Sequence, residues 1–361
     1  MRYRPYGNTG REISLIGFGG MRFPRPEKID ESAEVVLHAY HRGVNYFDTA
    51  PGYCGDHSEE IIGAAVREMK PGTYSVSTKS GREDGGELRR QLETSLKRIG
   101  VERIDFFHIW CIVTPDEWPR RVRGGAVAAA LKAKEEGLIG HVVVSAHLAG
   151  DELTRLLDEG PFEGVTLGYN AINFPYRQEA LFEAGRRGLG VVTMNPLGGG
   201  LIPKNAERFD FIRSAADASV VAAALRFNLS HSAVTCALVG FSNTRQVDEA
   251  VDAVENFRPH DSEHIAALRE KIIAEFNDLC TGCRYCLPCP AGVDIPRLME
   301  AYDFATLNGG DPKHIRDRLH WQWDLTPAAA ADCTQCGLCE QRCTQHLPIR
   351  QRLARIAALD E

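Results

Sequence analysis

The first part of the chain alternates short apolar runs with longer amphipathic stretches. From residue 3 to about residue 256, each run of β-branched and aromatic residues precedes a segment whose apolar positions recur every three or four residues. This alternation predicts repeated strand–helix units, with strands at residues 15–18, 45–48, 74–79, 104–110, 141–145, 164–169, 190–194 and 234–239. Eight strands close a (β/α)8 barrel, the TIM barrel, and an open doubly wound sheet is the alternative.

Three further segments complete the predicted architecture. The first residues predict a β-hairpin that closes the barrel floor, with its turn at residues 7–10. The arginine-rich residues 120–123 are expected on a solvated loop after the fourth strand. A helix over residues 261–278 then leads into a cysteine-rich segment. We therefore expect an α/β barrel domain at residues 1–277 and a small α-helical domain at residues 278–361.

Composition and charge narrow the range of partners. Hydrophobic residues make up 43% of the 361 residues and charged residues 25%, which is ordinary globular usage. The net charge is −7 without long runs of one sign, which argues against binding to nucleic acid or to an anionic membrane. The N-terminal residues lack the apolar core of a signal peptide, and no stretch reaches the ~18 apolar residues of a membrane span. We expect a cytoplasmic protein.

Three polar residues stand where the predicted second and third strands end. Asp48 closes the second strand, Tyr53 follows in the next loop, and Lys79 closes the third strand. Catalytic residues of such barrels lie at the carboxyl ends of the strands. An ammonium beside a phenol favours the ionised phenol and eases proton transfer to a carbonyl oxygen, and Asp48 would orient that ammonium. The alternative is a structural Asp–Lys pair with an incidental tyrosine.

Eight of the 11 cysteines form two groups near the C-terminus. In a reducing cytosol such groups indicate metal ligands, and C-x2-C-x2-C wraps one corner of a cubane cluster whose fourth ligand comes from the other run. The spacing therefore predicts two [4Fe-4S] clusters, the first on Cys280, Cys283, Cys286 and Cys343, the second on Cys333, Cys336, Cys339 and Cys289. One alternative is zinc, for which a third cysteine at this spacing is redundant. Another is a single cluster, because the first run has a short final gap and Thr344 stands where ferredoxins usually have proline.

The residues around these polar positions resemble a known family. Phe-Asp-Thr-Ala-Pro-Gly-Tyr at residues 47–53, Ser-Glu-Glu-Ile-Ile-Gly at residues 58–63 and Ser-Thr-Lys-Ser at residues 77–80 are similar to the aldo-keto reductase superfamily. The similarity extends over roughly residues 3–256. It implies an NAD(P)-dependent oxidoreductase that reduces a small-molecule carbonyl or oxidises an alcohol. Within it, Tyr53 would be the proton donor, tuned by Asp48 and Lys79.

One position departs from the family. Aldo-keto reductases usually have a histidine five residues after the aspartate that opens the fourth strand, and this chain has Trp110 there. His108 lies two residues earlier and therefore roughly 6 to 7 Å deeper in the barrel. It is either a catalytic residue or a buried core histidine. Because of this departure, the alternative function is a redox-sensing or electron-transfer protein that binds nucleotide but turns over little carbonyl.

The resemblance also implies where the nucleotide binds. The matching segments follow the strands and contain Gly20, Met21, Arg22, Ser145, Asn170, Pro196, Leu197 and Gly199. Glycines in such loops let backbone amides approach phosphate oxygens. Ser242 and Arg245, at the N-terminus of the last barrel helix, are expected to bind a 2′-phosphate. NADP is the expected cofactor and NAD the alternative, because Gly240 replaces a lysine that many NADPH-dependent members have.

The first cysteine run extends the resemblance to nearly the whole chain. Cys-Thr-Gly-Cys-Arg-Tyr-Cys-Leu-Pro-Cys-Pro at residues 280–290 resembles the branch of aldo-keto reductases that carries a C-terminal ferredoxin-like 4Fe-4S domain. Ferredoxin or another redox protein is therefore a candidate partner beside the small-molecule substrate. The resemblance indicates the type of reaction but no particular substrate.

Overall fold

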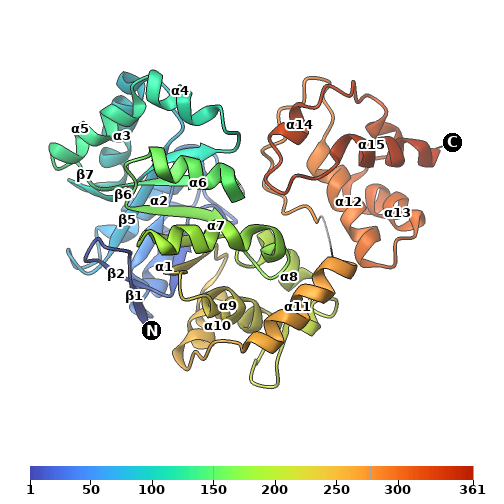
Figure 1. Cartoon of the computed structure of the whole chain (residues 1–361), viewed down its shortest axis with the longest axis horizontal. Helices are drawn as coiled ribbons and strands as arrows, with labels where there is room; N and C mark the ends of the chain where they lie inside the picture. Colours follow the sequence, from blue (N-terminus) through green and yellow to red (C-terminus); the bar gives the residue numbers. More distant parts are fainter. Residues whose placement is uncertain (149, 277–278, 361) are drawn as a thin grey trace.

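The N-terminal part of the protein is a closed barrel of parallel strands (Figure 1). The structure, a computed structural model, describes residues 1–148, 150–276 and 279–360. Around the barrel the strands follow the order β10–β3–β4–β5–β6–β7–β8–β9. They are β3 (Ile16–Gly19), β4 (Tyr46–Asp48), β5 (Ser75–Ser80), β6 (Ile104–Ile112), β7 (Ile139–Ala146), β8 (Gly164–Gly168), β9 (Gly190–Met194) and β10 (Cys236–Val239). The predicted (β/α)8 barrel is confirmed.

Helices cover the outside of the barrel. They are α1 (Ile29–His41), α2 (Ser58–Val66), α3 (Gly85–Ile99), α4 (Glu117–Arg123), α5 (Ala126–Glu135), α6 (Gly150–Glu159), α7 (Phe174–Arg186), α9 (Val220–Ser230) and α10 (Thr244–Glu255). The connection from β9 to α9 contains η1 (Gly198–Gly200), α8 (Leu201–Lys204) and η2 (Asp210–Ile212). Apolar faces of helices and strands form one large core between the two layers. The carboxyl ends of all eight strands therefore open on one face.

The predicted hairpin is also present. β1 (Tyr3–Pro5) pairs antiparallel with β2 (Glu12–Ser14), which confirms the expectation. Tyr6, which follows β1, is fully buried beneath the strands, and its ring centroid lies 4.3 Å from that of Phe106. A Cβ at Gly190 would lie 2.1 Å from the Tyr6 ring, so this close approach requires glycine. The hairpin thus closes the barrel end opposite the strand carboxyl ends.

The segment expected to be a solvated loop after the fourth strand is a helix. Residues 120–123 lie in α4, and Arg121 is only 6% exposed. Its guanidinium donates to the Trp110 carbonyl oxygen over 3.2 Å and pairs with Glu83 over 3.2 Å. The expected loop was wrong, whereas Val122 and Arg123 are exposed as expected; Arg121 instead covers the end of β6, which the charge pattern alone does not reveal.

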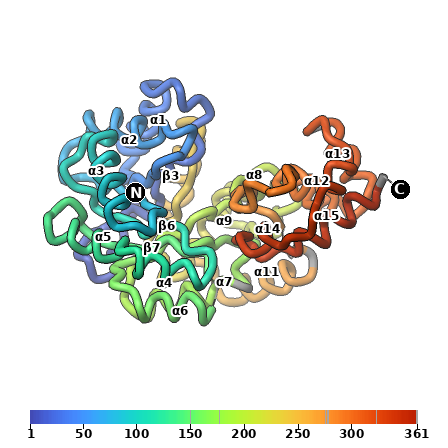
Figure 2. Tube along the Cα trace, turned by 90° about the horizontal axis from the view of Figure 1, so that it is seen from above, coloured from blue at the N-terminus to red at the C-terminus, as the bar shows by residue number. Residues whose placement is uncertain are grey.

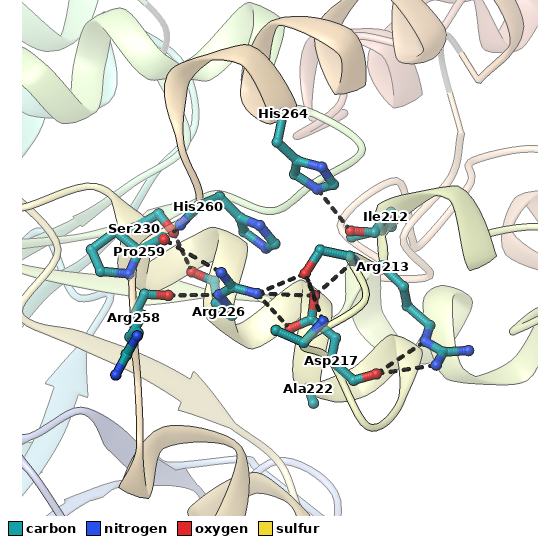
Figure 3. A network of polar contacts seen from close by, with 12 residues as sticks. Ile212, Arg213, Asp217, Ala222, Arg226, Ser230, Arg258, Pro259, His260 and His264 are labelled. Atoms are coloured by element: carbon teal, nitrogen blue, oxygen red, sulfur yellow. Dashed lines mark hydrogen bonds and ion pairs between the residues drawn. The ribbon is translucent and has the colours of Figure 1, made fainter.

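The chain leaves the barrel through a polar network centred on Arg226 of α9 (Figure 3). Arg226 donates to the Arg258 carbonyl oxygen over 2.6 Å and pairs with Asp217 over 3.2 Å. The His260 amide donates to Ser230 over 2.8 Å, and the His264 ring lies 3.1 Å from the Ile212 carbonyl oxygen. These contacts hold the start of α11 (Ser262–Glu275) against the barrel. The predicted end of this helix, at residue 278, lies outside the described residues.

The C-terminal part forms a separate small helical unit. It contains α12 (Ile295–Leu307), α13 (Pro312–Trp323), η3 (Pro327–Ala330), α14 (Leu338–Gln341), α15 (Ile349–Ala357) and η4 (Ala358–Asp360). Its own core includes Leu298, Leu319 and Leu353. Figures 1 and 2 show this unit beside the barrel, with the C-terminus at its far edge. The expected domain boundary between residues 277 and 278 lies outside the described residues. No helix in the described ranges has the length and apolar character needed to cross a bilayer.

The two units meet at the open end of the barrel. Arg177 of α7 is buried and donates to the carbonyl oxygen of His147 over 2.6 Å and to that of Thr344. Gly199 has a φ of +68°, and a Cβ there would lie 2.2 Å from the Thr281 carbonyl oxygen. The segment before α12 and the segment between α14 and α15 therefore pack directly on the barrel.

Candidate active site

A cavity of about 490 Å³ opens at the carboxyl ends of the barrel strands. Its wall includes Asp48, Tyr53 and Lys79, the three residues that the sequence singles out as a catalytic group. They come from β4, the loop after β4, and β5 respectively. The barrel thus brings the three side chains to one shared cavity, as catalysis by this group requires.

Asp48 and Lys79 form a buried ion pair. The Lys79 Nζ lies 2.5 Å from each carboxylate oxygen of Asp48 and donates to the Thr49 carbonyl oxygen over 3.0 Å. The residues are 2% and 3% exposed. Burial lowers the pKa of Lys79, and the negative charge of Asp48 opposes that shift. Asp48 also accepts a hydrogen bond from Ser77 over 2.7 Å, so two residues of β5 fix its carboxylate.

Tyr53 lies in a tightly turned loop beside this pair. Its ring centroid is 5.6 Å from the Lys79 Nζ and 5.6 Å from the Trp110 ring centroid, at an interplanar angle of 84°. Cys54 follows it at a φ of +54°. The loop is held by Asp56, which accepts from the Gly52 amide over 2.8 Å. Among the described residues the Tyr53 hydroxyl has no hydrogen-bond partner, which leaves it available to a bound molecule.

The acidity of Tyr53 depends on its burial. Burial, followed by the negative charge of Asp48, raises the pKa of Tyr53 well above its ordinary value. Desolvation thus dominates the acidity of this phenol in the protein alone, and the effect of Lys79 on it stays a prediction. The phenol therefore holds its proton at neutral pH.

His108 lies in the core beneath the cavity. It is fully buried, and it is not among the residues that line the cavity. Its Nε2 is 2.8 Å from the Thr166 hydroxyl, and its Nδ1 is 3.2 Å from the Ser77 hydroxyl. Burial and then the charge of Lys79 lower the pKa of His108 well below its usual value, so the ring is neutral. His108 therefore lies where a buried core histidine is expected. The next inward-facing residue of β6, Trp110, lines the cavity in its place.

Trp110 lies beside an irregularity in the strand pairing at the end of β6. The pairing of β6 with β7 shifts between Ile109 and Ile112, and Cys111 adopts a φ of +67°. Such a bulge re-aims neighbouring side chains. The indole ring of Trp110, next to this irregularity, lines the cavity and lies against Tyr53.

Most of the residues expected to bind nucleotide line the same cavity. They are Gly20, Met21, Arg22, Ser145, Pro196, Leu197, Gly199 and Ser242. Asn170 is fully buried and outside the lining, where its amide donates to the Asn195 carbonyl oxygen and braces that loop. Arg245 is exposed and also outside the lining. Gly240 lies so close to Arg22 that a Cβ there would be 2.6 Å from the Arg22 Cγ, which explains why a larger residue is absent.

Two lining charges were not anticipated from the sequence. Lys204 of α8 and Glu249 of α10 line the cavity together with Arg22. Glu249 accepts a hydrogen bond from Ser219 over 2.8 Å. No sequence motif marks Lys204 or Glu249, because both come from helices whose distance to the cavity depends on the closed barrel.

The cysteines of the C-terminal unit gather in two places. Five of them, together with Leu338 and Arg342, surround a small cavity: Cys286, Cys289, Cys333, Cys336 and Cys339. The thiols of Cys280 and Cys286 each interact electrostatically with those of Cys283 and Cys343. No disulfide joins any of these eight cysteines, all of which lie in the described ranges. In the described part of the chain, no three His, Cys, Asp or Glu side chains converge enough to hold a single metal ion.

Several amide groups point at these sulfur atoms. The Gly282 amide donates to the Cys280 Sγ over 3.4 Å, and the Leu347 amide donates to the Cys343 Sγ over 3.4 Å. Hydrogen bonds to sulfur stabilise the negative charge of an iron–sulfur centre. The donor set and its surroundings therefore fit thiolate-bound clusters.

Part of the cavity wall comes from the C-terminal unit. Cys283 and Tyr285 line the cavity together with His147, whose ring centroid is 5.2 Å from that of Tyr285. Burial, followed by the charges of Arg177 and His346, lowers the pKa of His147 to about 3, so this ring is neutral. Sequence reasoning missed these three residues as part of the cavity. No pattern in the sequence shows that a cysteine-rich segment docks on the barrel mouth.

Comparison with known proteins agrees with this architecture. A closed parallel barrel with an Asp–Lys pair and a tyrosine at its mouth is the architecture of an aldo-keto reductase. The model of the aldo/keto reductase family matches residues 15–273, and that of a 4Fe-4S dicluster domain matches residues 279–348. The chain therefore belongs to the aldo/keto reductase family. It is an oxidoreductase of that family with a C-terminal 4Fe-4S domain.

Individual relatives are more distant. L-galactose dehydrogenase of Arabidopsis thaliana is 27% identical over 281 residues, which cover 70% of this chain and 87% of that protein. The NADH-specific methylglyoxal reductase of Escherichia coli is 26% identical over 61% of this chain and 74% of its own length. A solved aldo-keto reductase of Bacillus halodurans in its holo form superposes with a TM-score of 0.63 at 21% identity, covering 74% of this chain and 96% of that one. At this identity the superposition shows the fold alone.

Proposed function

We propose that the protein reduces the carbonyl group of a small molecule, or oxidises the corresponding alcohol, with Tyr53 as the proton donor and a nicotinamide nucleotide as co-substrate. The observation that carries the proposal is the meeting of Tyr53 and the Asp48–Lys79 pair in one cavity with glycine-rich loops suited to a dinucleotide. A bound reduced nicotinamide would supply the hydride.

The raised pKa of Tyr53 suits a proton donor. A phenol that keeps its proton in the resting protein can still protonate the alkoxide that forms from a carbonyl, because an alkoxide is a far stronger base than a phenolate. The Lys79 ammonium, 5.6 Å from the Tyr53 ring, then stabilises the phenolate that remains. Asp48 holds that ammonium in place.

The nucleotide is proposed to be NADP(H), with NAD(H) as the alternative. Arg22 and Lys204 supply cations for phosphate groups, and Ser242 lies beside Arg22. Glu249 is a carboxylate in the same cavity and would favour a ribose hydroxyl over a 2′-phosphate. Among the relatives, the Escherichia coli methylglyoxal reductase is NADH-specific. Measured affinities for both nucleotides decide between them.

Anaerobic stopped-flow mixing tests the proposed function. Purified protein is mixed with NADPH or NADH and a panel of aldehydes that includes methylglyoxal and an aldose, two substrate types named for its relatives. We expect oxidation of the nucleotide that depends on the aldehyde. Tight nucleotide binding without oxidation by any aldehyde would instead support a redox-sensing protein.

We also propose that the C-terminal unit binds two clusters. Cys280, Cys283, Cys286 and Cys343 would hold the first cluster, and Cys289, Cys333, Cys336 and Cys339 the second. Each cluster would transfer single electrons, or it would stabilise the C-terminal unit by linking its cysteine-containing segments. Because thiolate clusters persist in a reducing compartment, a cytoplasmic location is part of the proposal, and ferredoxin or another redox protein is its candidate partner.

Metal analysis tests the number of clusters. Two cubanes predict about eight iron and eight sulfide per chain in anaerobically purified protein, without zinc. About four iron and four sulfide per chain would indicate a single cluster. Zinc without sulfide would contradict the assignment of these cysteines to iron–sulfur clusters. Electron paramagnetic resonance of the reduced protein provides the independent readout, because two nearby reduced clusters couple magnetically and one does not.

A further inference from the structure

The end of the cavity near Tyr53 is walled by rings. Trp110 contacts the edge of the Tyr53 ring, and Tyr285 contacts His147 at an interplanar angle of 74°. Tyr285 is also close enough to Tyr53 to interact with it electrostatically. Tyr53, Trp110 and His147 belong to the barrel, whereas Tyr285 belongs to the cysteine-rich segment. The C-terminal unit therefore completes this end of the cavity.

The position of Tyr285 is fixed from several sides. Its side chain lies close enough to that of Cys111, at the end of β6, for the two groups to shift each other's pKa. Thr281, four residues earlier, packs on Gly199, whose missing side chain permits the contact. The Cys283 Sγ lies 3.4 Å from the Thr344 hydroxyl, and Thr344 accepts from Arg177. The ring is thus held in the cavity wall by contacts on both units.

The charges at this end are already paired. Lys79 and Asp48 neutralise each other, and His147 is uncharged. The other lining charges, Arg22, Lys204 and Glu249, belong to the segments after β3 and β9 and to α10, which border the glycine-rich loops. Apart from Cys283, a proposed cluster ligand, the described lining residues at the Tyr53 end therefore present ring faces and no unpaired ion. Such a wall suits an uncharged molecule with a flat ring.

We propose that Tyr285, supplied by the cluster-binding segment, is a specificity-determining residue that packs on an uncharged ring of the carbonyl substrate. This inference rests on the proposed function in one respect: the substrate is taken to place its carbonyl group at Tyr53. Tyr285 lies between Cys283 and Cys286, so cluster coordination on both sides would hold the same ring in place. The C-terminal unit then contributes to substrate choice as well as to cluster binding.

Equilibrium binding without turnover tests this role. Benzaldehyde is the ring-bearing probe and acetaldehyde the ringless one, each titrated anaerobically into the complex with oxidised nucleotide while tryptophan fluorescence is followed. We expect Tyr285→Ala to weaken benzaldehyde binding at least about tenfold and acetaldehyde binding less than about twofold. Tyr285→Phe keeps the ring and should remain within about twofold of the unaltered protein for both probes.

Two controls separate pocket contact from structural damage. Trp321→Ala removes another aromatic ring of the C-terminal unit, one that is 81% exposed, and should change neither affinity. Iron content, the paramagnetic resonance spectrum and nucleotide affinity should be unchanged in the Tyr285 variants. The proposal is overturned if Tyr285→Ala binds benzaldehyde as tightly as the unaltered protein, if it loses both aldehydes or the nucleotide equally, or if the unaltered protein binds no benzaldehyde. Failure of the proposed function looks different, since both aldehydes would bind normally and neither would be reduced.

Discussion

Replacing Tyr53 by phenylalanine is expected to lower the rate of carbonyl reduction by about 10²- to 10⁴-fold, the usual contribution of a positioned general acid. The substitution removes only the hydroxyl, so the contact with Trp110 and the affinity for nucleotide should remain. The measurement is single-turnover oxidation of the reduced nucleotide by an aldehyde that the unaltered protein accepts.

A second Tyr-to-Phe change provides the matched control. Tyr40 is in α1, where its hydroxyl contacts Thr73 over 2.8 Å, away from the cavity. Tyr40→Phe should leave the single-turnover rate within about twofold. If Tyr53→Phe reduces aldehydes at the native rate, then another group donates the proton and the proposed role of Tyr53 is wrong.

Replacing Asp48 by alanine is expected to destabilise the barrel by about 3 to 5 kcal/mol, because the buried Lys79 ammonium would lose its partner. The Ser77 hydroxyl loses its acceptor as well. The measurement is the urea concentration at the midpoint of barrel unfolding, followed by circular dichroism under anaerobic conditions.

The double variant Asp48→Leu/Lys79→Met distinguishes charge from packing. Apolar residues of similar size leave no unpaired charge, so most of the lost stability should return. Carbonyl reduction should remain low in the double variant, because no ammonium stabilises the Tyr53 phenolate. An Asp48→Ala variant as stable as the unaltered protein would show that the ion pair is not buried as the structure has it.

The barrel and its catalytic strand ends could be predicted from the sequence because their signals are local. Alternating apolar runs place all eight strands, and Asp48 and Lys79 occupy strand ends that any closed parallel barrel brings together. The glycine-rich segment around Gly199 follows β9, so its place at the cavity also follows from the strand order. These features depend on periodicity and topology alone.

The features that sequence reasoning missed depend on non-local contacts. The acidity of Tyr53 is governed by burial, which spacing does not report. Trp110 lines the cavity while His108, one inward position deeper on β6, stays in the core, and the bulge at Cys111 that follows them has no signal in the sequence. Tyr285 joins the wall only because the C-terminal unit docks on the barrel, and its own motif indicates cluster binding alone. Each of these outcomes requires knowledge of which distant segments touch.

The most direct test of the central claim follows the label of a reduced nucleotide deuterated at carbon 4 during one anaerobic turnover with an aldehyde. The account predicts an alcohol that carries one deuterium on the former carbonyl carbon, formed at a rate that Tyr53→Phe lowers, while the visible absorbance of the C-terminal domain stays constant. With both C4 hydrogens replaced by deuterium, an unlabelled alcohol, or bleaching of that absorbance with the aldehyde unchanged, would contradict hydride transfer from the nucleotide to a carbonyl, and a rate that Tyr53→Phe leaves unchanged would contradict proton donation by Tyr53.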